Sequence, residues 1–207
     1  MRESRQVWYA SYGSNMHRAR LAIYLAGCRD PRPPQRSVPV ELPGSMYFAY
    51  ESKRWTGGMA FYDPEAPGTV WARAHLLTEG QFADVATQEM HGVPGAEPEQ
   101  EGGLAVDLGG LGAGERVVLG DGRYETVVGL GELEGLPLVT CTAPWGMGDI
   151  AWRRPAGRYL GHVAAGLVEA GKWEGRGIVE YLAGRPGVAG EWGVGEIRAL
   201  VEAAGEG

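Results

Sequence analysis

Short apolar runs separated by glycine and proline turns are the feature that most constrains how this chain can fold. Runs of this length, rich in β-branched and aromatic residues and bounded by turn residues, are typical of strands. Glycine makes up 35 of 207 residues, about twice its ordinary share, and it shows no G-x-y period, which excludes a collagen. The pattern predicts strands over residues 7–12, 38–42, 46–50, 59–62, 70–77, 116–119, 124–130 and 137–141.

Helical periodicity lies between and after these runs. Thr78 followed three residues later by Gln81 fits a capping box, which predicts a helix that continues to about Met90. Pro155 suits the first residue of another helix, which Gly171 ends. Further helices are expected over residues 16–25, 177–183 and 194–204. No repeat or linker divides the sequence, so residues 1–207 are expected to form a single domain, with a core over 7–183, a Gly/Glu-rich loop over 91–115 and a helical tail over 184–207.

Composition excludes several classes of protein. A formal net charge of −7 argues against nucleic acid as the main partner, because phosphate binding needs clustered Lys and Arg. No stretch approaches the roughly 18 apolar residues that cross a bilayer, and the first residues do not resemble a signal peptide. The two cysteines, Cys28 and Cys141, are interpreted as reduced thiols, which predicts a cytoplasmic protein. The seven Trp permit a homodimer surface.

Tyr12-Gly13-Ser14-Asn15, at a predicted strand-to-helix turn, is the first candidate site. Glycine lets the backbone turn tightly and approach a ligand closely. The first amides of a helix have no partner within the helix, so they can bind a carboxylate or a polarised carbonyl. A plain tight turn with a helix cap has the same pattern, and the pattern by itself leaves both interpretations open.

Glu89 is the second candidate. On the predicted helix, Phe82, Val85, Ala86 and Glu89 lie at i, i+3, i+4 and i+7, so the carboxylate projects from the edge of the core-facing stripe. Partial desolvation there favours the neutral acid, as a general acid/base working near neutral pH requires. If the helix frays before Met90, Glu89 is instead an ordinary solvated residue.

The other motifs in the sequence give weaker evidence of a function. The four histidines lack metal-ligand spacing, and the sequence contains no H-E-x-x-H or C-x-x-C, so no metal is expected. The stretch 109–114 lacks the G-x-G-x-x-G spacing of a dinucleotide loop, so no cofactor is expected. No G-x-S-x-G elbow surrounds Ser14, which weakens a serine hydrolase interpretation.

Taken in order, these segments resemble the γ-glutamylcyclotransferase-like family. Tyr12–Met16 after an apolar first strand is similar to the family's Tyr-Gly-Ser-Asn-Leu loop. Trp55–Ala60 is like its stretch of small residues before a central strand. Val70–Leu77, with a helix that ends in Thr87–Met90, resembles the unit that carries the family's catalytic Glu. Pro155–Tyr159 resembles the start of its C-terminal helix.

The resemblance implies an α+β fold, with a mixed sheet curled into a small barrel and flanked by helices. It also implies a reaction in which the α-amino group of a small γ-glutamyl amide attacks its own γ-carbonyl, which forms 5-oxoproline and releases an amine. Amides of Tyr12 to Asn15 would hold the substrate's oxygens, and Glu89 would be the general acid/base. No metal or cofactor is implied.

The sequence departs from the family in places. The family often has Gly and then Tyr soon after the catalytic Glu, whereas Met90-His91-Gly92 here leads into the loop over 91–115. Two alternatives stay open: a non-catalytic module that binds a small carboxylate or a protein, and an amide hydrolase or acyltransferase with Ser14 as nucleophile and His91 as base. The sequence offers no ligand set to support a zinc deacetylase.

Overall fold

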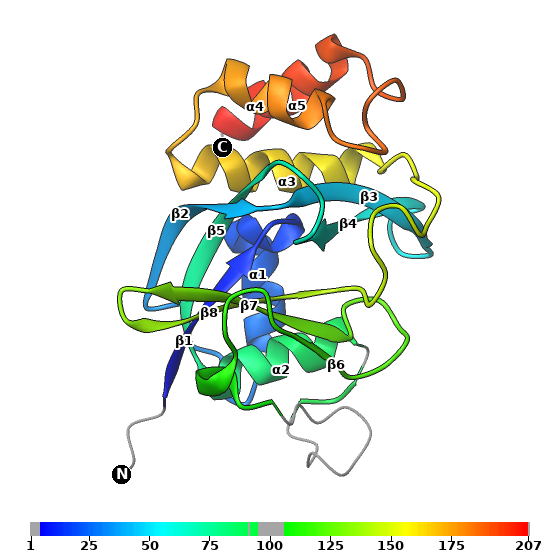
Figure 1. Cartoon of the computed structure of the whole chain (residues 1–207). Coiled ribbons are helices and arrows are strands. Elements are labelled where there is room, and N and C mark those ends of the chain that lie inside the picture. Colours follow the sequence, from blue (N-terminus) through cyan, green and yellow to red (C-terminus); the bar gives the residue numbers. More distant parts are fainter. Residues whose placement is uncertain (1–4, 91, 95–105, 207) are drawn as a thin grey trace. The chain divides into compact units, whose positions relative to one another are not determined.

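The computed structural model describes residues 5–90, 92–94 and 106–206 (Figure 1). Every strand and helix expected above is present, within a few residues at each end. The strands are β1 Gln6–Ser11, β2 Arg36–Pro43, β3 Ser45–Ser52, β4 Gly57–Asp63, β5 Thr69–Thr78, β6 Arg116–Val118, β7 Thr126–Leu133 and β8 Leu136–Thr142. The helices are α1 Arg18–Ala26, α2 Glu79–Glu89, α3 Gly157–Ala170, α4 Gly175–Ala183 and α5 Val194–Gly205, with short 3-10 helices η1 Ser14–Met16 and η2 Leu108–Gly110.

The strands form a mixed sheet. Its order is β2-β5-β1-β8-β7-β6, with β1 parallel to β8 and β7 antiparallel to both β8 and β6. β3 and β4 pair separately as an antiparallel hairpin. The α+β class with helices around a mixed sheet is confirmed. In the described residues β2 and β6 are edge strands, so hydrogen bonds do not close the sheet into a complete barrel.

The chain forms two compact units, each built from distant segments. The first unit contains residues 1–10, 21–37 and 74–144, and the second contains 11–20, 38–73 and 145–207. The strand β5 therefore begins in the second unit and ends in the first. The single domain expected from the sequence stays a prediction.

Local signals explain where two helices begin and end. The hydroxyl of Thr78 accepts the Gln81 N–H at 3.1 Å, and the Gln81 side chain accepts the Thr78 N–H at 3.1 Å, so the capping box is present. Gly171 ends α3 in the left-handed region, with φ of 70°, where a residue without Cβ has no steric penalty.

Three local expectations differ from the structure. The helix expected from Met16 begins at Arg18, because Ser14–Met16 form the tighter 3-10 turn. Pro155 was expected to be the first residue of its helix, but α3 begins at Gly157 after the cap residue Ala156. The segment over 91–115 was expected to be a loop, but its described end, 106–115, contains the 3-10 helix η2; residues 91 and 95–105 of that loop lie outside the described residues.

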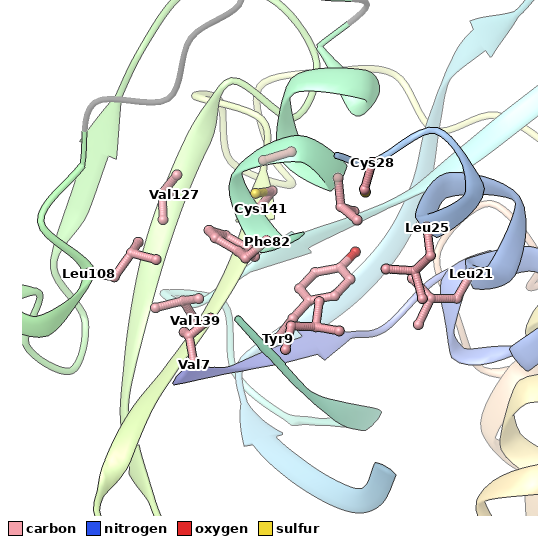
Figure 2. Close-up of a cluster of buried hydrophobic side chains, with 13 residues drawn as sticks. Val7, Tyr9, Leu21, Leu25, Cys28, Phe82, Leu108, Val127, Val139 and Cys141 are labelled. Atoms are coloured by element: carbon pink, nitrogen blue, oxygen red, sulfur yellow. The ribbon is translucent and has the colours of Figure 1, made fainter. Parts of the chain in front are cut away.

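The core of the first unit lies between α2 and the strands β1, β7 and β8 (Figure 2). Phe82 projects from α2 toward Tyr9 of β1, and their ring centroids are 5.7 Å apart. Apolar burial of this kind, at about 25 cal/mol per Å², is the main favourable contribution to folding. The cluster consists of Val7, Tyr9, Leu21, Leu25, Cys28, Leu77, Phe82, Val85, Ala86, Leu108, Val127, Val139 and Cys141.

In the second unit, α3 packs against α4, α5 and η1. Leu160, Val163, Ala164 and Leu167, at i, i+3, i+4 and i+7, form its buried apolar stripe. The tail over 184–207 contains α5, so it adds to this packing. No helix in the described part of the chain is long and apolar enough to cross a membrane.

Candidate active site

The Tyr12–Asn15 loop belongs to the second unit and follows directly after β1. Gly13 precedes η1, and Ser14 and Asn15 are buried inside that 3-10 turn. No side chain caps η1, so the expectation that Ser or Asn caps a helix here is wrong. The turn is instead closed by backbone hydrogen bonds, from the Met16 N–H to the Gly13 carbonyl and from the His17 N–H to the Ser14 carbonyl.

Gly13 sits where β4 and α3 approach the loop. A Cβ at this position would lie 3.3 Å from the Ala60 Cβ and 3.3 Å from the Tyr159 hydroxyl. That hydroxyl accepts the Ala60 N–H at 3.1 Å. The close approach explains why glycine suits this position. Three segments singled out in the sequence, Tyr12–Asn15, Trp55–Ala60 and Pro155–Tyr159, thus meet within one unit.

Arg73 anchors the residue after the loop, and its role was not visible in the sequence. Its guanidinium, 2% exposed, donates to the Met16 carbonyl at 3.0 Å and to the Glu169 carboxylate at 2.8 Å. The Arg18 N–H donates to the same carboxylate oxygen at 2.9 Å. Burial lowers the pKa of Arg73, and the contacts with Glu169 oppose this shift. These charge-assisted hydrogen bonds hold the backbone that leaves the loop.

His17 and His162 form a stacked pair beside this anchor. Their Nδ1 atoms are 3.1 Å apart and their ring centroids 5.3 Å apart, so one Nδ1 must donate and the other accept. His17 Nε2 lies 3.4 Å from the Glu169 carboxylate. Burial, followed by the charges of His17 and two nearby arginines, lowers the pKa of His162.

Glu89 belongs to the first unit and is the last residue of α2. Phe82, Val85 and Ala86 are buried as the periodicity predicted, and Glu89 at i+7 is partly buried. The helix α2 therefore includes Glu89 and does not fray before this residue. Burial raises the pKa of the Cys141 thiol, and the negative charge of Glu89 raises it further.

The sequence-predicted site residues are thus divided between two units: Tyr12, Gly13, Ser14 and Asn15 lie in one and Glu89 in the other. The base suggested for a Ser14 nucleophile, His91, lies outside the described residues. Within the described ranges, no group of three or more His, Cys, Asp or Glu side chains could hold a metal ion.

Comparison with known proteins identifies the fold. No family model matches the chain. A solved structure of a γ-glutamyl cyclotransferase superimposes with a TM-score of 0.55 and 16% identity, over 96% of this chain and 99% of that one. An uncharacterized protein from Homo sapiens gives a TM-score of 0.56 at 17% identity, with the same coverage. The chain therefore has the γ-glutamyl cyclotransferase fold, which the sequence resemblance predicted.

A curated relative is also similar in sequence. Histone deacetylase 5 of Arabidopsis thaliana is 30% identical over 199 aligned residues, which include 80% of this chain. The match spans only 28% of the length of that relative. The similarity thus concerns a minor part of a longer protein.

Proposed function

We propose that this chain is a γ-glutamylcyclotransferase-type enzyme that acts on a small γ-glutamyl amide. The observation that carries the proposal is the enclosure of Gly13 by Ala60 and Tyr159. It brings three of the segments that resemble the family together in one place. The fold, shared with a γ-glutamyl cyclotransferase over 96% of this chain, supports the same conclusion.

The proposed reaction needs few catalytic groups. The α-amino nitrogen of the substrate attacks its γ-carbonyl carbon, a C–N bond forms in the five-membered ring of 5-oxoproline, and the original amide C–N bond breaks. Proximity within one molecule favours this ring closure. Because the nucleophile belongs to the substrate, no Ser, Cys, metal or organic cofactor is required of the protein.

Glu89 is the proposed general acid/base. Starting ionised, it accepts a proton from the α-ammonium group and returns it to the nitrogen of the breaking amide bond. The attacking nitrogen loses a second proton as the ring N–H forms, and Glu89 passes this proton to the same departing nitrogen, which leaves as an ammonium, so the proton count balances. The amides of Tyr12 to Asn15 are the proposed donors to the oxygen on which negative charge develops. The position of Glu89 at the last turn of α2, where it is partly buried, supports this role.

The test is 5-oxoproline release from a panel of γ-glutamyl amino acids and amines. Glu89→Gln should lower kcat by at least about a hundredfold, as expected when a general acid/base is removed. Glu79→Gln makes the same chemical change at the other end of α2 and should retain activity. Both variants should give wild-type circular dichroism spectra.

Equal activity of Glu89→Gln and wild type would show that the acid/base assignment is wrong. If no compound in the panel is turned over, the result would favour the alternative function, a module with the same fold that binds a small carboxylate or a protein. Cys28 and Cys141 are both buried thiols, which supports a reducing, cytoplasmic setting as part of the proposal.

A further inference from the structure

Trp55 is surrounded by three guanidinium groups, and we call these four residues the Trp55 cluster. The Cζ atoms of Arg20, Arg54 and Arg158 lie 5.3, 5.7 and 5.8 Å from its ring centroid. They come from α1, from the turn between β3 and β4, and from the first turn of α3. Each cation is attracted to the electron-rich face of the indole, but the three like charges repel one another.

Two of the three arginines in this cluster present their positive charge to solvent. Arg54 and Arg158 are exposed, and among the described residues neither forms an ion pair. Glu169, on the same helix as Arg158, already contacts Arg73 and His17. That these two arginines form no ion pair within the described ranges is unusual in a chain with a formal net charge of −7.

His162 lies beside the same arginines and is affected by their charge. Its ring centroid is 5.6 Å from that of Trp55. Its pKa is lowered by burial and then by the charges of His17, Arg20 and Arg158. A site where an imidazole resists protonation because of neighbouring cations is one that favours an anion.

The cluster is also next to the candidate loop. The Trp55 and Tyr159 rings meet edge to face with centroids 5.2 Å apart. The Tyr159 hydroxyl is the group that would lie 3.3 Å from a Cβ added at Gly13. One aromatic ring therefore separates the cluster from the loop, and all these residues belong to the second unit.

We propose that the Trp55 cluster binds a carboxylate group of the substrate. Guanidinium groups bind carboxylates through paired, charge-assisted hydrogen bonds. The two exposed guanidinium groups beside the indole, those of Arg54 and Arg158, therefore suit a carboxylate. The identity of the ligand rests on the proposed function. The carboxylate has two sources in a γ-glutamyl compound, the α-carboxylate of the glutamyl part and a carboxylate on the departing amine.

The first experiment measures binding without turnover. Glutarate is titrated calorimetrically at low ionic strength into wild type, Arg54→Gln, Arg158→Gln and the control Arg198→Gln. Arg198 is an exposed arginine on α5 of the same unit. Each cluster variant should bind glutarate about tenfold more weakly, the loss typical of one charge-assisted hydrogen bond, and the control should match wild type. Absent binding to wild type, unchanged affinity in both cluster variants, or an equal loss in the control overturns the proposal.

The second experiment identifies the source of the carboxylate. KM is compared for γ-glutamylglycine, whose departing amine carries a carboxylate, and γ-glutamylethylamine, whose amine does not. A rise confined to γ-glutamylglycine in Arg54→Gln and Arg158→Gln assigns the departing amine, and a rise with both substrates assigns the α-carboxylate. Unchanged KM with both substrates overturns the proposal while the proposed function stands. Arginine-dependent glutarate binding without any turnover refutes the proposed function and supports the anion site.

Discussion

Two glycines of α3 provide a matched test of how tightly this helix packs on the candidate loop. At Gly166 an added Cβ would lie 2.3 Å from the Met16 Cβ and 2.7 Å from the His17 nitrogen. At Gly161 its nearest contact is Leu200 at 3.7 Å, which is ordinary van der Waals distance. Both positions lie in the helix interior, so alanine gains the same helix propensity at each.

The expected changes in the free energy of unfolding have opposite signs. Replacing glycine by alanine inside a helix gains about 1 kcal/mol, and Gly161→Ala should stabilise the protein by roughly this amount. In Gly166→Ala the Met16 contact is more than 1 Å too short, so α3 and the residue after the loop must separate. Overpacking of this kind costs about 1–3 kcal/mol, and because backbone atoms are involved we expect the upper end. The net loss is then about 1–2 kcal/mol.

Urea unfolding measures this difference. With a slope of roughly 2 kcal/mol/M, the midpoint of Gly166→Ala should fall by about 0.5–1 M, and that of Gly161→Ala should rise. Since the displaced backbone directly follows Asn15, Gly166→Ala should also reduce 5-oxoproline release, whereas Gly161→Ala should not. If Gly166→Ala is as stable as Gly161→Ala, the close packing of α3 on Met16 is refuted.

Two further predictions concern the same unit. Burial and neighbouring cations lower the pKa of His162 in the folded state, so the unfolded state binds more protons and stability should fall as pH drops below about 6.5, the ordinary histidine pKa. His162→Gln should reduce the slope of the urea midpoint between pH 7.5 and 5.5, and an unchanged slope would contradict this. Tyr159→Phe leaves the buried Ala60 N–H without its acceptor at 3.1 Å, at a cost of about 1–3 kcal/mol. Thermal unfolding at pH 7.5 measures it, and an unaltered Tm would show that this hydrogen bond contributes nothing.

Signals carried by neighbouring residues predicted most of the secondary structure. Thr78 and Gln81 determine where α2 begins, and Gly171 determines where α3 ends, because each acts on backbone groups within a few residues. The i, i+3, i+4 spacing of Phe82, Val85 and Ala86 similarly predicted the buried face of α2.

Local patterns were less reliable where two conformations are close in energy. The sequence after Gly13 suits both an α-helix and a 3-10 turn, and the structure has the 3-10 turn before α1 begins at Arg18. Pro155 is compatible with the first helical residue, yet α3 begins two residues later at Gly157. A proline tolerates either position, so packing of the surrounding chain decides the boundary.

The sequence by itself predicted most of the helices and strands and the buried face of α2. It also supplied two candidate sites, Tyr12–Asn15 and Glu89, whose roles stay predictions. Only the tertiary structure showed the contacts around the loop, because they join residues far apart in the chain: 99 positions separate Ala60 from Tyr159, and 145 separate His17 from His162. The same holds for the three arginines that converge on Trp55. Side-chain and backbone preferences act over a few residues, whereas these contacts exist only once distant segments pack together.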